Sequence, residues 1–338
     1  MSFVSKLEST MDRFAFSHFG VSALERPHSI ETYRQWIRDG HHGEMEYLAE
    51  HLEIKEDPRR WSPRANGAIV VAKPYYPHPY GEPAMPGLRT SLYAQGDDYH
   101  VHFANELEDL AIALRADFPD EEFLCFTDSA PILERDLAYR AGLGWVGKNT
   151  CLIHPEHGSL FFLGQIFTTL ELASARPPIA DFCGQCDRCI RACPTGAIEE
   201  PRKLNATKCI SYWNIEARGA APEKLRARFG DWFFGCDICQ TVCPWNEKTH
   251  GREVLRELTK PKGADVEQLR AILNESNRGV GRMSKATPLR RARGRGLKRN
   301  ALYVIGNLRL RELKNEVEAQ LSHPDLNEIA RWALAQLT

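Results

Sequence analysis

Four cysteines fall within the eleven positions 183–193, and their spacing constrains the fold of the chain more than any other feature. The run CGQCDRCIRACP has the pattern C-x2-C-x2-C-x3-C-P, formed by Cys183, Cys186, Cys189 and Cys193. In bacterial ferredoxins this spacing lets three thiolates bind one [4Fe–4S] cluster while the fourth binds a second cluster. A zinc site is the alternative, but zinc needs only two CxxC pairs and no fourth cysteine before a proline. The run therefore predicts an iron–sulfur domain that holds two clusters.

The second cluster needs ligands of its own, and a second Cys-Pro pair at 243–244 indicates where they lie. The same spacing, counted back from Cys243, requires cysteines at 239, 236 and 233, but position 233 is a phenylalanine. Cys209 is the one unassigned cysteine between the two runs, so we expect it to supply the missing thiolate. The predicted ligand sets are Cys183, Cys186, Cys189 and Cys243 for one cluster, and Cys193, Cys209, Cys236 and Cys239 for the other. Two adjacent clusters favour electron transfer over a purely structural role.

The rest of the composition is typical of a cytoplasmic globular protein. The 338 residues are 43% hydrophobic and 26% charged, and they leave room for two or three domains. No stretch of about eighteen apolar residues occurs, and the N-terminal residues lack the apolar core of an export signal. We therefore expect a cytoplasmic chain that does not span a membrane and forms no disulfides. Cys125 and Cys151 lie in apolar runs, and we expect both to be ordinary buried thiols.

The long region before the cysteines mixes strand-like and helix-like patterns. Residues 65–72 (ANGAIVVA) and 123–126 (FLCF) are typical of buried strands, whereas an apolar stripe within 99–118 predicts a helix. A shorter helix is expected over 131–141, and a hairpin over 151–172. These patterns predict an α+β or α/β layer with ligand-binding loops at the strand ends.

One glycine-rich loop of this region is similar to a phosphate-binding loop but lacks its context. Residues 142–149, GLGWVGKN, nearly match G-x4-G-K-[ST], but Asn149 replaces the hydroxyl that binds magnesium. The loop also follows a predicted helix and precedes a strand, which is the reverse of the required order. ATP hydrolysis is therefore excluded, while Lys148 can still approach the polar edge of another ligand.

The net charge of −1 hides a strongly basic tract near the C-terminus. Residues 282–299, RMSKATPLRRARGRGLKR, contain eight Lys or Arg residues and no acidic residue. A solvated surface is one interpretation of such a tract. Phosphate binding is the other, and it is the natural use of the tract in a protein that binds nucleic acid. The candidates for phosphate contact are Arg290, Arg291, Lys298 and Arg299.

Five motifs together resemble the tRNA epoxyqueuosine reductases. They are DSAPILERDLAYRAGLGWVGKNT (128–150), the cysteine run through PTGAI (183–198), KCISYWNIEARG (208–219), GCDICQTVCPWN (235–246) and PLRRARGRGLKRNALYVIGN (288–307). The resemblance implies an α+β (α/β-like) fold with three domains. These are a cobalamin-binding catalytic α/β domain over 1–172, a ferredoxin-like domain with two [4Fe–4S] clusters over 173–250, and a HEAT-like α-helical, tRNA-binding domain over 251–338. The implied activity is the reduction of epoxyqueuosine to queuosine at the wobble position of tRNA, with release of water.

The resemblance also implies roles for individual residues. Asp128 would protonate the departing oxygen, although a helix N-cap at Asp128 or Ser129 is the simpler interpretation of this turn. The implied cobalamin contacts are Arg59, Asp128, Lys148, Asn149, Ser211 and Asp237, with a solvated turn as the alternative for Arg59, and the implied anticodon-loop contact is Arg218. The D-x-H-x-x-G signature of histidine-ligated cobalamin begins at Asp98 and His100 but fails at Phe103. This departure fits a family that holds its cobalamin without that histidine.

Cluster electrons arrive singly, whereas reduction of an epoxide to an alkene needs two, so cobalamin would supply the two-electron chemistry. A low-potential donor such as flavodoxin or ferredoxin is the expected electron source, and a monomer is expected because one tRNA needs one active site. Two other classes remain open. A cobalamin-dependent reductive dehalogenase would share the cofactors, but it usually carries an export signal and lacks a basic C-terminal domain. A plain iron–sulfur electron-transfer protein would need neither the Asp128 turn nor the glycine-rich loop.

Overall fold

A four-stranded antiparallel sheet forms the centre of the N-terminal region in this computed structural model, which describes residues 3–174 and 177–338. In spatial order the strands are β1 (His18–Ala23), β2 (Gly67–Pro74), β7 (Phe161–Thr168) and β4 (Phe123–Phe126). β2 pairs with β1 on one side and β7 on the other, and β4 pairs with β7. The strands expected over 65–72 and 123–126 are thereby confirmed as β2 and β4.

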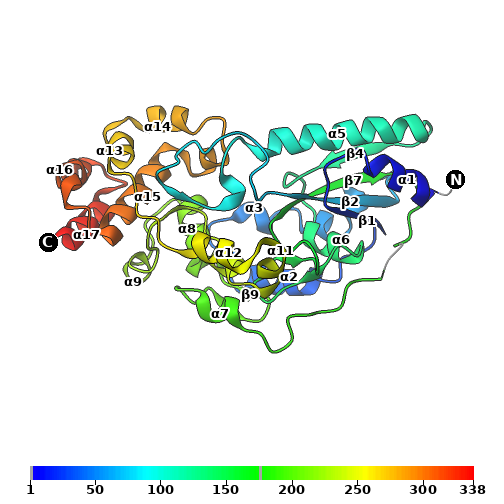
Figure 1. Cartoon of the computed structure of the whole chain (residues 1–338), viewed down its shortest axis with the longest axis horizontal. Coiled ribbons are helices and arrows are strands. Elements are labelled where there is room, and N and C mark those ends of the chain that lie inside the picture. The colour runs from blue at the N-terminus through cyan, green and yellow to red at the C-terminus, as the bar shows by residue number, and fades with distance from the viewer. Residues whose placement is uncertain (1–2, 175–176) are drawn as a thin grey trace.

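Helices cover both faces of this sheet because its central strands are apolar on both sides. Ile69 and Val71 pack with α1 (Phe3–Met11) and α5 (Tyr99–Asp117) on one face. Ala68 and Val70 pack with α6 (Glu134–Arg140) on the other face. The helix predicted over 99–118 is confirmed as α5, the long helix along the top of Figure 1.

The hairpin expected over 151–172 does not form as predicted. β6 (Leu152–Ile153) pairs with β5 (Trp145–Val146), whereas β7 pairs with β2 and β4. A single bridge, between His154 and Gly158, joins the two expected strands. The physical reason is burial: inside the central sheet β7 covers apolar side chains on both faces, which an isolated two-stranded hairpin cannot do.

Short helices and loops carry the cysteines between the sheet and the C-terminal helices (Figure 1). They are α7 (Arg188–Ala192), β8 (Ile198–Glu200), β9 (Lys203–Leu204), α8 (Ile210–Ile215), α9 (Glu223–Arg226), β10 (Trp232–Phe234), α10 (Ile238–Thr241), α11 (Pro244–His250) and α12 (Arg252–Thr259). Three further short helices, α2 (Ile30–Arg38), α3 (Glu46–Ala49) and α4 (Leu52–Glu56), belong to the N-terminal region. Because α7 packs against α10, the two cysteine runs lie beside each other.

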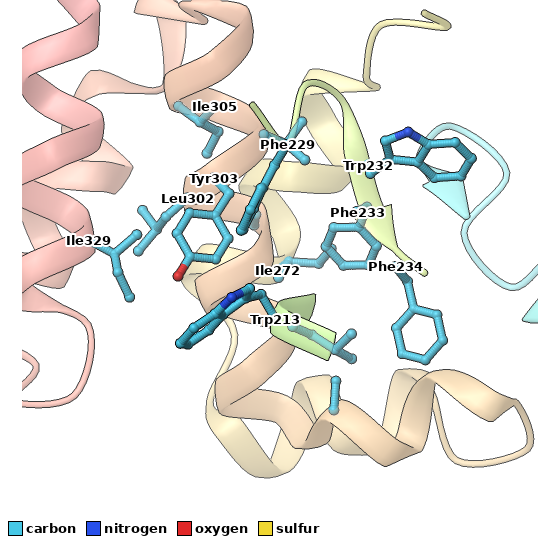
Figure 2. Packing of buried hydrophobic residues seen from close by; sticks show 14 of the residues in the cluster. Trp213, Phe229, Trp232, Phe233, Phe234, Ile272, Leu302, Tyr303, Ile305 and Ile329 are labelled. Atoms are coloured by element: carbon cyan, nitrogen blue, oxygen red, sulfur yellow. The ribbon is translucent and has the colours of Figure 1, made fainter. Parts of the chain in front are cut away.

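The C-terminal region is helical, with α13 (Val266–Asn274), α14 (Asn277–Met283), α15 (Arg293–Leu308), α16 (Lys314–Ala319) and α17 (Asn327–Leu337). The central helix α15 packs against α13, α14 and α17, and also against α8 and β10. Figure 2 shows Leu302 and Tyr303 of α15 in one core with Trp213 and Phe229. The hydrophobic core is therefore continuous across the predicted domain boundary at residue 250. Among the helices that the structure describes, none has the length and apolar character needed to cross a membrane.

The segment 89–92 joins the N-terminal region to the cysteine-bearing region. β3 (Arg89–Thr90) pairs in parallel with β10, and the backbone N–H of Ser91 donates to the carbonyl of Phe234 at 2.8 Å. Arg89 Nη1 donates to Asp231 Oδ1 at 2.7 Å, and both side chains are buried. Removing one partner of such a buried ion pair costs about 3–5 kcal/mol. The segment that leads into α5 is thus held by residues next to the second cysteine run.

Candidate active site and cluster-binding cysteines

The first group of thiols combines Cys183, Cys186 and Cys189 around α7 with Cys243 at the start of α11. Burial raises the pKa of Cys189, and the neighbouring Cys183 and Cys186 thiols raise it further. Burial also raises the pKa of Cys243 to about 11, with Cys183 adding to the shift. Thiols from two distant runs therefore lie close enough to interact, as the crossed spacing predicted.

The second group combines Cys193, Cys209, Cys236 and Cys239. Burial raises the pKa of Cys236 well above its ordinary value, and the Cys209 and Cys193 thiols raise it further. Cys209 stands at the N-cap of α8, and Cys239 lies in α10 shortly after Cys236, so three separate stretches of chain supply this group. The structure thus brings together the same two sets of thiols that the sequence predicted, and their binding of clusters stays a prediction at this point.

Neither group has the geometry of a single-ion site. Within residues 3–174 and 177–338, no three His, Cys, Asp or Glu side chains gather closely enough to hold one metal ion. A zinc site places every sulfur about 2.3 Å from one centre. A [4Fe–4S] cluster instead binds each thiolate to a different iron, so its ligands stand farther apart. The arrangement favours clusters over zinc.

The glycine-rich loop contacts both groups. Lys148 Nζ donates to the carbonyl of Gly184, beside the first group, at 2.6 Å. Asn149 is buried, and its Nδ2 donates to the carbonyl of Cys239 at 3.2 Å while its Oδ1 accepts from the backbone N–H of Cys151 at 3.2 Å. Cys151 is only partly buried, and its thiol is hydrogen-bonded to Cys239. This loop therefore links the two cysteine groups, and Cys151 lies at the second group rather than in an ordinary core.

Asp128 lies just after β4 in a conformation that is uncommon for an L-residue. Its φ of +49° is in the left-handed region, and its backbone N–H donates to Glu134 Oε1 at 2.8 Å. Tyr99 Oη donates to Asp128 Oδ2 at 2.9 Å, and His100 Nε2 lies 3.5 Å from the same oxygen. A tyrosine, a histidine and a glutamate thus surround this carboxyl group.

The helix N-cap expected in the Asp128 turn is wrong. The helix α6 begins at Glu134, and Leu133 stands at its N-cap without a side-chain hydrogen bond. The Asp128 side chain is instead 65% exposed, so the protein alone does not bury it. Strained backbone is retained where the surroundings hold it in place, and such positions are frequent at functional sites. The turn therefore leaves the Asp128 carboxyl group accessible and away from the helix end.

Tyr93 and Glu134 are neighbours of Asp128, and Tyr93 also lies near the second cysteine run. Burial raises the pKa of Glu134 to about 8, and the charge of Asp128 raises it further. Burial also raises the pKa of Tyr93, and the charges of Asp128 and Asp237 add to this shift. Both side chains keep solvent-accessible surface. Because Asp237 lies between two cysteines of the second group, Tyr93 is close both to Asp128 and to that group.

The other residues predicted to contact a cofactor lie in three different settings. Ser211, in α8, directs its backbone N–H at the sulfur of Cys209 and so lies at the second group. Asp237 is buried, and its carboxylate accepts a hydrogen bond from Ser91. This carboxylate therefore holds two segments together, and its predicted contact with a cofactor stays a prediction. Arg59 is exposed and pairs with a neighbouring aspartate, as in a solvated turn.

The basic tract divides into exposed and buried residues. Arg290 and Arg291 are exposed, and Arg290 Nε lies 3.9 Å from an oxygen of Asp98. Lys298 and Arg299 are buried, and both donate to backbone carbonyls. They are less accessible to a phosphate than Arg290 and Arg291, because α15 is packed on several sides and their charged groups bind the protein itself. The exposed charge of the tract lies before and at the start of α15.

Arginines line a pocket of about 200 Å³ where the start of α15 meets the cysteine-bearing region. Arg218, Arg293 and Arg295 contribute to its walls, with Arg299 behind them. Burial and the charge of Arg293 lower the pKa of Arg218, as expected where cations crowd together. Sequence reasoning named Arg218 but missed Arg293 and Arg295. Their alternation with small residues after Arg291 was the available signal.

Comparisons with known proteins bear on this assembly. A family model described as "Epoxyqueuosine reductase QueG, DUF1730" matches residues 55–129, and one described as "4Fe-4S double cluster binding domain" matches residues 182–246. A protein named epoxyqueuosine reductase from Escherichia coli is 34% identical over 95% of this chain and 86% of its own. Another from Gloeobacter violaceus is 37% identical over 89% and 95%, respectively. The chain belongs to the epoxyqueuosine reductase family.

Solved structures of epoxyqueuosine reductases share this fold. One, from Streptococcus thermophilus, matches with a TM-score of 0.85 at 23% identity, over 100% of this chain and 90% of that one. Another, described as a crystal structure with a tRNA-Tyr epoxyqueuosine-modified tRNA stem loop, matches with a TM-score of 0.81 at 24% identity, over 99% and 90%. The predicted α+β fold and oxidoreductase class are confirmed. The double-cluster match spans all eight cysteines of the two groups, which leaves zinc without support.

Proposed function

We propose that this epoxyqueuosine reductase reduces epoxyqueuosine to queuosine at the wobble position of tRNA. Electrons are delivered one at a time through two [4Fe–4S] clusters, Asp128 donates a proton to the departing epoxide oxygen, and water is released. The clusters are held by Cys183, Cys186, Cys189 and Cys243, and by Cys193, Cys209, Cys236 and Cys239. A low-potential protein such as flavodoxin or ferredoxin is the electron donor.

The observation that carries this proposal is that Asp128 and the second cysteine group lie close to the same side chain, Tyr93. A reductive ring opening needs a proton source and an electron source on the same substrate atoms. The charges of Asp128 and of Asp237, which lies within the second cysteine run, both raise the pKa of Tyr93. A nucleobase placed beside Tyr93 would therefore have both sources within reach.

Cobalamin is the implied cofactor of this site. When bound, it supplies the two-electron chemistry that one-electron clusters lack. Ser211 and Asn149 would hold it, because both lie at the second cysteine group. His100 is not available as a cobalt ligand, since its Nδ1 lies 2.7 Å from Asp98 and its Nε2 faces Asp128. This agrees with a cofactor bound without a protein histidine.

The arginine pocket supports tRNA as the partner. A nucleic acid is positioned mainly through phosphate contacts by Arg and Lys. Arg218, Arg293 and Arg295 surround a pocket on the protein surface, and the exposed Arg290 lies beside Asp98, next to His100 and the Asp128 turn. A stem loop whose backbone contacts these arginines can place its wobble base near Asp128.

The test is a reconstituted reaction followed by nucleoside mass spectrometry. Cluster-loaded protein is incubated with epoxyqueuosine-containing tRNA and a strong reductant, with and without added cobalamin. The expected result is queuosine only when cobalamin is present. The control is the same mixture with protein freed of iron. No queuosine from protein that holds both clusters and cobalamin would overturn the proposal.

A further inference from the structure

Asp128 is the end of a short chain of ionisable groups that leads to the exposed Arg290 of the basic tract. His100 Nε2 lies 3.5 Å from Asp128 Oδ2, and His100 Nδ1 lies 2.7 Å from Asp98 Oδ1. Arg290 Nε follows, 3.9 Å from the other oxygen of Asp98. The imidazole is therefore held between two carboxylates, and both of its nitrogens face one of them.

The position of His100 is fixed by the start of α5. Asp98 is the N-cap of this helix and accepts from the backbone N–H of His100 at 3.2 Å, in addition to its contact with the ring. The His100 ring stacks on Tyr99 with 4.1 Å between ring centroids, and Tyr99 in turn stacks on Phe162 of β7 at 4.0 Å. These contacts hold the ring in one orientation although the side chain is 42% exposed.

The charge state of His100 follows from these neighbours. Burial lowers the pKa of His100, but hydrogen bonding to Asp128 and Asp98 outweighs this effect and raises the pKa to about 9. The hydrogen bond to His100 lowers the pKa of Asp98. At neutral pH the pair is therefore an imidazolium and a carboxylate, and Nε2–H points at Asp128. The charged or titratable groups around this unit are Tyr99, Asp128, Glu134, Arg135 and Arg290.

The proposed reduction needs two protons, whereas Asp128 can carry one. Breaking the two C–O bonds of the epoxide and forming the C=C bond consumes two electrons and converts the oxygen to water with two protons. Asp128 gives the first proton when the first C–O bond opens. It must be protonated again before the second C–O bond breaks and the hydroxyl group leaves as water.

We propose that His100, positioned by Asp98, is the group that protonates Asp128 again during each turnover. The Nε2 proton moves to Asp128 Oδ2, and His100 becomes neutral while it keeps its Nδ1–H, which donates to Asp98 Oδ1. The two electrons come from the low-potential donor through the clusters. This inference rests on the proposed function, since it assigns the source of the second proton in that reaction. His100 acts through Asp128 and not on the substrate.

The first test replaces the imidazole and follows the rate against pH. His100→Gln keeps a hydrogen-bonding side chain but cannot carry the proton, so queuosine formation at pH 8 should fall by about 100-fold. The defect should shrink at pH 6, where solvent can protonate Asp128 directly, and added imidazole should restore part of the rate. His102→Gln is the matched control, because this histidine lies on the same helix, is 44% exposed against 42% for His100, and pairs with Asp97.

The second test moves the imidazole pKa without removing the ring. Asp98→Asn keeps a good helix N-cap but removes the negative charge. Loss of an adjacent negative charge should lower the pKa of His100 by about 1 to 3. The rate of queuosine formation should therefore begin to fall at a lower pH than it does in the wild type. The same shift should appear in the His100 resonance of ¹³C-histidine-labelled, cluster-loaded protein, which is measured without tRNA. This variant also decides the matter if His100→Gln fails to fold.

The outcomes separate the two proposals. Wild-type rates and pH profiles for His100→Gln or Asp98→Asn, together with a strong defect in Asp128→Asn, would overturn the relay and leave the proposed function standing. A His100 resonance that titrates near pH 6.5 in the wild type would also overturn the relay. If the wild-type protein formed no queuosine, both the proposed function and the relay would be overturned.

Discussion

The two cysteine groups have the same number of thiols but different surroundings. The first group lies close to the protein surface. Phe182 beside it is 51% exposed, and a Cβ atom added to Gly184 would have no atom of the protein within 4 Å. The second group is enclosed by Phe233 and Phe234 of the shared core and by Asn149 of the glycine-rich loop. Clusters in unequal surroundings differ in potential and in access for a partner. The first group is therefore the one that a partner protein can approach more easily.

The largest effect is expected from Cys209→Ser. This change removes one ligand of the second group, so the iron content should fall towards half and queuosine formation should cease. The electron paramagnetic resonance signal of the first cluster should persist. Cys125→Ser is the control, because this thiol bonds a carbonyl of α5 far from both groups. Full iron retention would show that another residue completes the second site.

Asp128→Asn should leave both groups intact and still remove most of the activity. The amide keeps the size of the carboxyl group but has no proton to give, so the rate of queuosine formation should drop by about 100- to 10,000-fold. Cobalamin binding and both cluster signals should match the wild type. Asp97→Asn, at the neighbouring exposed aspartate, serves as the control. A folded, fully loaded Asn variant with normal turnover would remove Asp128 from the mechanism.

A smaller effect is expected when the arginine pocket is neutralised. In the variant Arg293→Gln/Arg295→Gln, the log–log dependence of tRNA affinity on salt should flatten by about 0.7 to 0.9 for each lost phosphate contact. Neither cluster should sense the change, because the pocket lies outside both groups. Lys314→Gln, on the exposed side of α16, should leave the slope unaltered. If the pocket variant had the same salt dependence of tRNA affinity as the wild type, the basic tract would be only a solvated surface.

The smallest effect should separate the two clusters most directly. Trp145 Nε1 donates to the sulfur of Cys183 at 3.4 Å, and hydrogen bonds to cluster sulfurs are one determinant of their potential. Trp145→Phe removes this donor while it keeps the aromatic packing against Trp245. A redox titration should show a lower potential for one cluster and no change for the other. Equal shifts in the potentials of both clusters would show that this hydrogen bond does not act on the first cluster alone.

The sequence was most informative where function depends on spacing. Ferredoxin spacing requires a cysteine at position 233, and the structure explains why a phenylalanine can stand there. Phe233 is fully buried in the core that β10 shares with α15, while Cys209 reaches the second group from the N-cap of α8. The helix α5 and the strands β2 and β4 were also predictable, because their apolar periodicity is local.

The sequence was least informative where the outcome depends on contacts between distant segments. Lys298 and Arg299 belong to a charged run, but α14 approaches α15 so closely that a Cβ on Gly294 would lie 1.9 Å from the carbonyl oxygen of Asn277. Only the packed structure shows that the charges after this glycine turn inward. His100 was read as part of an incomplete cobalamin motif, and its place between two carboxylates depends on the Asp128 turn, which no local pattern shows.

The pairing of β3 with β10 has a consequence for how the protein is made. Arg89 and Asp231 stand 142 positions apart in the chain, so a ribosome must synthesise the cysteine-bearing region before the segment that leads to Asp98 and His100 finds its partners. That region also binds the iron. A nascent chain that is not supplied with clusters would therefore lack one of the contacts that position the segment leading to Asp98 and His100. Iron shortage would affect the shape of the N-terminal site as well as the supply of electrons to it.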